Sequence, residues 1–222
     1  MEKEKGILRK NFKICIPAYK MVFAALFFAF LALVRGITHV YEIGIAMDAN
    51  VGLFAAIFCS DTYEIEYREK RWEIFRLLPS ENRRKTIRQR LYLQIGFLSV
   101  LSAAGYWLFY WQSPQTAYGG APALLYGMYL IAVITSIIFW GALSMSLVNL
   151  FRNLWAGIGV SVVIWLCVNS TWGSELLGNF SVFSFVFRLD EEGGTWDWLM
   201  GKGIALLIAI FLIGRKGKKY EY

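Results

Sequence analysis

The chain has 222 residues, of which 57% are hydrophobic and 17% aromatic, and it carries a formal net charge of +7. Its charged residues gather in a few blocks between long apolar stretches, which excludes an ordinary soluble domain and indicates a single all-α membrane domain, 1–222. Anionic lipid headgroups account for the basic excess, so no nucleic-acid partner is expected.

Residues 1–18 alternate basic and apolar positions, a pattern typical of an amphipathic helix whose basic face lies on lipid headgroups. Pro17 predicts a bend into the first apolar run. A frayed basic tail is the alternative. No small-residue cleavage site follows, so the first apolar run is interpreted as a retained helix and not as a removed signal.

At roughly 20 residues per crossing, the chain has room for about six membrane crossings, and it contains six apolar candidate segments. The second, fifth and sixth are short or interrupted by polar residues, so their ends are the least defined. The predicted crossings are Tyr19–Val40, Ile43–Ser60, Leu91–Trp111, Ala123–Phe151, Trp155–Val168 and Leu199–Gly214.

The basic residues orient these crossings. If the chain crosses the membrane six times, 20 of the 23 Lys and Arg residues lie on the same side, in the two termini and in the loops after the second and fourth crossings. Short cytoplasmic loops carry such an excess of basic residues, so this side is expected to be the cytoplasm. Arg35, Arg188 and Lys202 are the three exceptions, in outward loops or near outer helix ends. We therefore expect a multi-pass protein of the cell membrane with both termini in the cytoplasm.

Residues 61–90 form a dense island of charge between the second and third crossings. Trp72, Phe75 and Leu78 recur at helical spacing and predict an apolar stripe on a short cytoplasmic helix that Pro79 ends. Ser80 is the expected cap of the next helix, with Glu81 in its first turn. Such a stripe predicts docking on a partner protein, or else contact with lipid.

Residues 169–198 predict a different structure on the outer side. The centre of this segment, residues 176–187, is apolar and aromatic but too short to span a bilayer. We expect a re-entrant or interfacial hairpin before the last crossing, with Phe180, Phe183 and Phe187 as an extracellular gate.

Catalytic and nucleotide-binding motifs are few. The sequence has no phosphate-binding loop and a single histidine, His39, so no catalysis, no metal and no cofactor is expected in this chain. The three cysteines lack metal-ligand spacing, and each predicts a small buried apolar residue. Arg35 and Asp48 are a candidate polar pair near the outer face, either at headgroup level or on a substrate path.

The charged island resembles the cytoplasmic loop of ATP-binding-cassette type-two exporter permeases, also called type V exporters. Their loop typically reads Glu-Arg-Glu-x-Gly-Thr, then leucines, then Leu-Pro and a basic helix start. The matching run here is Glu66-Tyr-Arg-Glu-Lys-Arg-Trp-Glu-Ile-Phe-Arg-Leu-Leu-Pro79, in which Lys70 and Arg71 replace the usual Gly-Thr. The layout of six crossings with an outer hairpin before the sixth is also similar.

The resemblance implies a permease subunit that forms a pathway as a dimer, with a second copy or a paralogue, and that docks two copies of a separate ATPase. That ATPase, and not this chain, would bind ATP and Mg²⁺. The expected coupling residues are Glu66, Glu69, Trp72, Phe75, Leu78 and Pro79.

Small permeases of this kind resemble peptide exporters and lantibiotic-immunity permeases of Gram-positive bacteria, which move amphipathic peptides such as phenol-soluble modulins. An amphipathic peptide is therefore the expected substrate. Export of a drug, lipid or glycan, and a non-conducting anchor or sensor subunit, are the alternatives. An intramembrane enzyme would require clustered ionisable residues inside the crossings, and the sequence has almost none.

Overall fold

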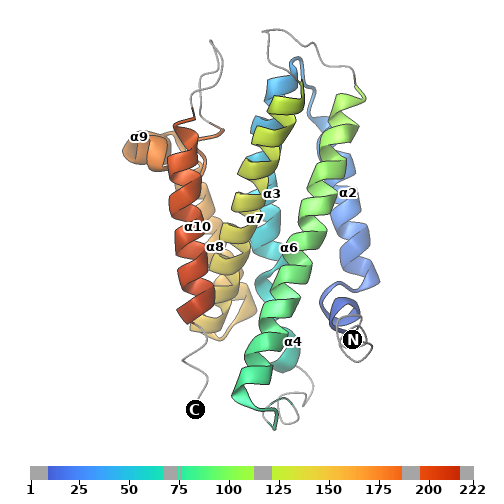
Figure 1. Cartoon of the computed structure of the whole chain (residues 1–222), viewed down its shortest axis with the longest axis vertical. Coiled ribbons are helices and arrows are strands. Elements are labelled where there is room, and N and C mark those ends of the chain that lie inside the picture. Colours follow the sequence, from blue (N-terminus) through green and yellow to red (C-terminus); the bar gives the residue numbers. More distant parts are fainter. Residues whose placement is uncertain (1–9, 68–74, 76, 113–121, 187–195, 216–222) are drawn as a thin grey trace.

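The computed structural model describes residues 10–67, 75, 77–112, 122–186 and 196–215, and all regular secondary structure within these ranges is helical. The long helices lie side by side along the axis of the molecule (Figure 1). The all-α fold class is therefore confirmed.

Six long helices correspond to the six predicted apolar segments. Shorter elements lie between them: η1 (Ser60–Thr62), α4 (Glu64–Tyr67), α9 (Thr171–Leu177) and η2 (Gly178–Phe180). The long helices are α2 (Ala18–Val34), α3 (Val40–Phe58), α6 (Ser80–Tyr110), α7 (Pro122–Phe151), α8 (Leu154–Val168) and α10 (Trp198–Arg215).

Three of these helices, α3, α6 and α7, are long and apolar enough to cross a membrane. The pair formed by α8 and the segment Thr171–Phe180 counts as a fourth span, although it bends by 71° at the break. Helices α2 and α10 are apolar but shorter. The structure thus contains three to four candidate spans, which is compatible with a membrane protein.

Local sequence signals set the helix starts. Pro17 is the extended residue before α2, which confirms the predicted bend. Asn153 caps α8, because its side chain accepts hydrogen bonds from the N–H groups of Trp155 and Ala156. Glu81 lies in the first turn of α6 as expected, but the expected Ser80 cap is wrong: Pro79 is the extended flanking residue, so Ser80 is already helical.

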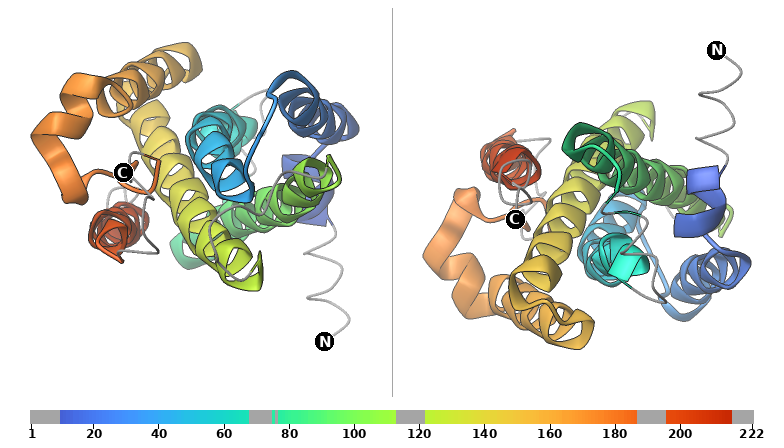
Figure 2. Two further views of the ribbon diagram at one scale, coloured as in Figure 1. Left: turned by 90° about the horizontal axis from the view of Figure 1, so that it is seen from above. Right: turned by 90° about the horizontal axis from the view of Figure 1, so that it is seen from below.

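Helix α7 is the centre of the bundle. It packs most extensively against α3, then against α8 and α10. Helices α8 and α10 lie on one side of α7, and α2, α3 and α6 lie on the other (Figure 2). Close approach of α3 and α7 depends on Gly52, where a Cβ would lie 2.8 Å from Cδ1 of Trp140. The indole N–H of Trp165 on α8 donates to the carbonyl of Ala49 on α3 at 3.0 Å.

The bundle carries apolar side chains outside and several polar side chains inside. Phe23 and Phe30 on α2 and Leu207 on α10 are each about two thirds exposed, whereas Asp48 and Gln94 are fully buried. A helix that is apolar on its outer face matches a lipid environment and not water.

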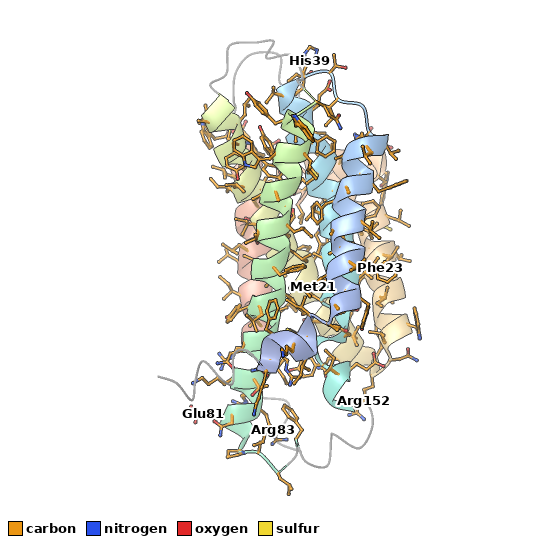
Figure 3. The ribbon with its side chains drawn as sticks, turned by 90° about the vertical axis from the view of Figure 1, so that its right-hand side faces the viewer. Met21, Phe23, His39, Glu81, Arg83 and Arg152 are labelled. Atoms are coloured by element: carbon orange, nitrogen blue, oxygen red, sulfur yellow. The ribbon has the colours of Figure 1, made fainter. Side chains whose placement is uncertain are left out.

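Basic residues gather at one end of the bundle, here called the basic end. Arg83 near the start of α6 and Arg152 after α7 lie there, and His39 lies at the opposite end (Figure 3). Near the basic end, a short helical turn over residues 10–15 exposes Lys10 and Lys13 and buries Cys15. Residues 1–9 lie outside the described residues, so the amphipathic segment 1–18 stays a prediction.

The segment after α8 leaves the bundle and then returns to it. Helix α9 projects beside the bundle at the end opposite the basic end (Figure 1). Residues 181–186 then turn back inward, so that Phe183 and Phe185 are buried. A re-entrant hairpin between α8 and α10 was expected, and the described part of residues 169–198 has this inward turn.

Candidate functional site

Three buried polar side chains from three helices meet inside the bundle, and we call them the charge cluster: Asp48 of α3, Ser136 of α7 and Lys202 of α10. The Nζ of Lys202 lies 2.6 Å from Oδ2 of Asp48 and 2.6 Å from Oγ of Ser136. The hydroxyl of Ser136 donates to Oδ1 of Asp48, also at 2.6 Å. Asp48 and Ser136 are fully buried, and Lys202 is 2% exposed.

The three helices bring residues together that are up to 154 positions apart in the sequence. Asp48 lies in the ninth position of α3 and Lys202 in the fifth position of α10, so both are only a few turns from the helix starts opposite the basic end. Ser136 lies near the middle of the 30-residue α7. The cluster therefore lies inside the bundle, closer to the end where α9 projects.

The returning segment 181–186 holds α10 beside this cluster. Phe183 stacks on Trp140 with ring centroids 5.8 Å apart, and Phe185 meets Trp198 edge-on at 4.9 Å. The hydroxyl of Ser184 lies 3.2 Å from the carbonyl oxygen of Trp198 and donates to it. Gly201, next to Lys202, permits this approach, because a Cβ there would overlap the carbonyl oxygen of Ser181.

Burying this pair is costly unless each charge is compensated. Removing a carboxylate and an ammonium from water costs several kcal/mol per ion, and apolar residues of similar volume often give equal or greater stability. Ionisable residues within membrane helices are accordingly rare and mark functional sites by default. The three short contacts pair the two charges with each other and with the hydroxyl of Ser136.

The cluster does not have the parts of a serine nucleophile. Lys202 donates to the oxygen of Ser136, so in this arrangement it does not accept the hydroxyl proton as a base would. Ser136 donates its proton to Asp48 and not to Lys202. All three residues lie within helices whose backbone N–H groups are already bonded, so they offer no oxyanion donors.

Asp48 was predicted to pair with Arg35, but in the structure its cationic partner is Lys202. Arg35 follows α2 at the end of the bundle and its side chain is exposed, whereas Asp48 is buried and pairs with Lys202. An arginine at the aqueous end keeps its hydration, so it gains little by entering the bundle.

The two predicted gate residues that the structure describes, Phe180 and Phe183, lie in different environments. Phe180 is 55% exposed in η2, whereas Phe183 is fully buried against Trp140 and Trp165. Phe187 lies outside the described residues. Gating stays a prediction, and Phe183 is part of the core, so an aspartate at this position is expected to destabilise the fold.

The predicted coupling residues are only partly described. Glu66 lies in α4, while Glu69 and Trp72 lie outside the described residues. Phe75 was expected on an exposed stripe but is 7% exposed and belongs to the main apolar core. Two neighbours remain available to a partner: Leu77 is 85% exposed and Leu78 42% exposed. Pro79 is exposed beside them.

A second polar cluster lies toward the basic end, and we call it the basic-end network: Lys20, Asp61, Thr62 and Gln94. Lys20 donates to Oδ1 of Asp61 at 2.6 Å and to the carbonyl of Phe58 at 3.1 Å. Thr62 Oγ1 lies 2.6 Å from Gln94 Oε1, and Gln94 Nε2 donates to Asp61 at 3.4 Å. The network joins the start of α2, the end of α3 and helix α6.

The remaining described chemistry is sparse. No group of three or more His, Cys, Asp or Glu side chains that could hold a metal ion is found among the described residues. Cys15 and Cys59 are buried as predicted, whereas Cys167 is exposed, so the expectation of burial is wrong for Cys167. No family model, no curated protein and no solved structure matches this chain.

Sequence reasoning found Asp48 but missed its two partners. The signal for Lys202 was present, because it is a lysine between two glycines inside the last apolar run. Ser136 gave no comparable signal, since a serine in an apolar helix commonly bonds to its own backbone. The contacts of Ser136 with Asp48 and Lys202 are evident only from the packing of α3 and α10 against α7.

Proposed function

We propose that this chain is the membrane permease subunit of an ATP-driven exporter, crossing the membrane six times with both termini in the cytoplasm. In this proposal two permease chains form the pathway and two copies of a separate ATPase bind the basic end, which faces the cytoplasm. The chain itself binds no nucleotide and catalyses no reaction.

The observation that carries the proposal is the continuity of α6. This helix has 31 residues and runs from a charged start at the basic end through the whole bundle (Figure 1). Force applied to residues 77–79, which are exposed, would be transmitted along a stiff helix, because an α-helix of this length behaves as one element. Phe75, two residues before Leu77, is itself buried in the same bundle.

The basic-end network supports transmission to other helices. Gln94 on α6 contacts Asp61 after α3, and Asp61 binds Lys20 on α2. A displacement of α6 would therefore also shift the start of α2 and the end of α3. A subunit that only anchors a partner would not need this linkage.

An amphipathic peptide is the substrate we propose, and a drug, lipid or glycan is the alternative. The support is the sequence resemblance together with the apolar exterior, from which a lipid-soluble cargo could enter laterally. A charge cluster inside the bundle favours a cargo that also carries charge.

Isolation of the tagged chain from its native membrane in a mild detergent, followed by an ATP hydrolysis assay, tests the class of protein. We expect a co-purifying ATPase whose activity rises when an amphipathic peptide is added to the reconstituted complex. Leu77→Glu should reduce the recovered ATPase, while Phe180→Glu, at the other end, should not. A pure chain without ATPase, and with no hydrolysis, would overturn the proposal.

The orientation has its own test. In a chain from which the three native cysteines have been removed, Leu77 or Thr38 is replaced by Cys; these positions are exposed near opposite ends. Whole cells that carry each variant are then treated with a membrane-impermeant thiol reagent. We expect Thr38→Cys to react in intact cells and Leu77→Cys only after permeabilisation. The opposite pattern would invert the topology.

A further inference from the structure

We propose that Asp48 and Ser136 form a binding site for a primary ammonium group, which Lys202 occupies as a tethered ligand in this conformation. The part of the inference that concerns cargo rests on the proposed export function. In that part, the ammonium of a cationic amphipathic peptide takes the place of the lysine when α10 withdraws.

The site has the chemistry that an ammonium group requires. A primary ammonium offers three N–H donors and no acceptor. Around Nζ of Lys202 stand a carboxylate oxygen of Asp48 and the hydroxyl oxygen of Ser136, each at 2.6 Å. The hydroxyl proton is directed to the other carboxylate oxygen, so the oxygen of Ser136 presents a lone pair to the cation.

The acceptor half of the site is independent of α10. Asp48 and Ser136 lie on α3 and α7, which form the most extensive helix pair in the bundle, and they bond to each other directly. Gly52 and Trp140 pack these two helices closely one turn further along. The carboxylate is therefore preorganised whether or not Lys202 is present.

The donor half lies on a peripheral helix. Among the described helices, α10 packs extensively only on α7 and η2, and its first turn also contacts the returning segment 181–186 (Figure 2). The outer face of α10 is apolar and exposed, as at Leu207 and Phe211. A helix held at one side can move away with its lysine, which would leave the carboxylate without its cation in an apolar surrounding.

An unpaired carboxylate there would be strongly unfavourable, so a second cation would be recruited. An aromatic group lies beside it: Tyr129 packs near Gly44, one turn before Asp48, and its ring is part of a stack with Tyr106 and Tyr126. Aromatic faces attract ammonium groups. A cargo with an apolar face and a lysine or amino terminus fits this combination, whereas an anionic cargo does not.

Chemical rescue tests the site without any ATPase or export. Replacing Lys202 by Ala removes a fragment that n-propylammonium reproduces. We expect the midpoint temperature of unfolding of the purified full chain Lys202→Ala to rise by several degrees, saturably, with n-propylammonium chloride. Wild-type chain, whose lysine fills the site, should show no saturable rise at the same concentrations.

Matched probes separate charge recognition from simple cavity filling. The neutral n-propanol, tetramethylammonium without N–H groups, and sodium chloride at equal ionic strength should each give no saturable rise. Asp48→Asn in the Lys202→Ala background should abolish the rescue, and Ser136→Ala should raise the half-saturating concentration about tenfold, the equivalent of one hydrogen bond. Equal stabilisation by n-propanol and n-propylammonium would overturn the ammonium site.

A measurement on the wild-type chain applies if Lys202→Ala does not fold. Lys202 is buried and should react slowly with an acylating reagent. The reagent is kept in excess over all amines, so that the added peptide does not consume it. Adding an amphipathic peptide with free amines should increase acylation of Lys202 several-fold, and the same peptide with acetylated amines should not. No increase with either peptide would contradict displacement of the lysine.

A failed rescue of Lys202→Ala by n-propylammonium, alongside an intact permease–ATPase complex, would reject only this site and leave the proposed function standing.

Discussion

Two lysine–aspartate pairs in this bundle have the same geometry but different surroundings. In both, Nζ lies 2.6 Å from a carboxylate oxygen. The Lys202–Asp48 side chains are 2% and 0% exposed, whereas Lys20 and Asp61 toward the basic end are 13% and 20% exposed. Distance alone therefore does not describe what each pair contributes.

The difference lies in what each charge would meet if its partner were removed. Near the basic end, Lys20 also donates to the carbonyl of Phe58 and lies 4.8 Å from the ring centroid of Phe58, and both members of the pair are partly exposed. At the charge cluster, Asp48 without Lys202 would keep the hydrogen bond from Ser136 but lose its cation in a fully buried position. The buried pair is thus indispensable once formed, although it does not have to add net stability, and the basic-end pair adds a small increment.

Breaking the buried pair should have the largest effect. Lys202→Met leaves an unpaired buried carboxylate, and we expect a loss of about 3–5 kcal/mol in the free energy of unfolding. Asp48→Leu combined with Lys202→Met removes both charges and should recover most of that loss. Reversible unfolding in mixed detergent measures both. A double variant as unstable as the single one would mean that packing, and not charge, dominates the site.

The apolar contacts of the returning segment 181–186 with α7 and α8 should come next. Phe183 is fully buried against Trp140, and Phe183→Ala is expected to cost about 3 kcal/mol through a cavity in the core. Phe180→Ala, three residues earlier and 55% exposed, is the matched control and should change stability by less than about 0.5 kcal/mol. Equal effects of the two changes would contradict the placement of the returning segment.

The sequence predicted the apolar helices well because their signal is local. Composition and run length place the six segments, and Pro17 and Pro79 mark real helix boundaries. The same local signals could not show that Phe183 turns inward while Phe180 stays outside. A short aromatic run contains no periodicity that distinguishes lipid from core.

The candidate site was predictable only in part, because it depends on which helices become neighbours. Asp48 was conspicuous as an acidic residue in an apolar run, and the nearest cation in sequence, Arg35, was chosen as its partner. The actual partner, Lys202, is 154 positions away. Which distant helices become neighbours is decided by the packing of the bundle. A single sequence therefore shows that Asp48 is a charge in an apolar run, but not that Lys202 is its partner.

Breaking the basic-end pair should have a smaller effect that depends on salt. Lys20→Met is expected to lower the free energy of unfolding by about 1 kcal/mol at low ionic strength and by less at 0.5 M salt, because a partly hydrated pair is screened. Arg35→Gln, which removes an exposed cation at the other end, is the control and should have no measurable effect. A loss for Lys20→Met as large as for Lys202→Met, and independent of salt, would erase the distinction between the two pairs.

The smallest expected effect concerns Cys15, a thiol close to the basic-end network. Burial raises the pKa of Cys15 from 9.0 to about 11, although Arg90 and Lys20 nearby act in the opposite direction. The folded chain therefore keeps this proton between about pH 9 and 11 while the unfolded chain loses it. Because the unfolded state binds fewer protons in that window, this group makes stability fall as pH rises through it.

Alkylation kinetics measure this shift directly, since the thiolate is the reactive form. In a chain whose other two cysteines are replaced by Ala, the rate for folded Cys15 should keep rising about tenfold per pH unit from pH 8 to 10. In the denatured chain the rate should level off above about pH 9. At pH 8 the folded thiol should react about 100-fold more slowly from the pKa difference alone, and burial slows it further. A plateau near pH 9 in the folded chain would show that Cys15 is hydrated, and hence that the short helix over residues 10–15 does not pack on α6 as the Asn11–Gln89 hydrogen bond indicates.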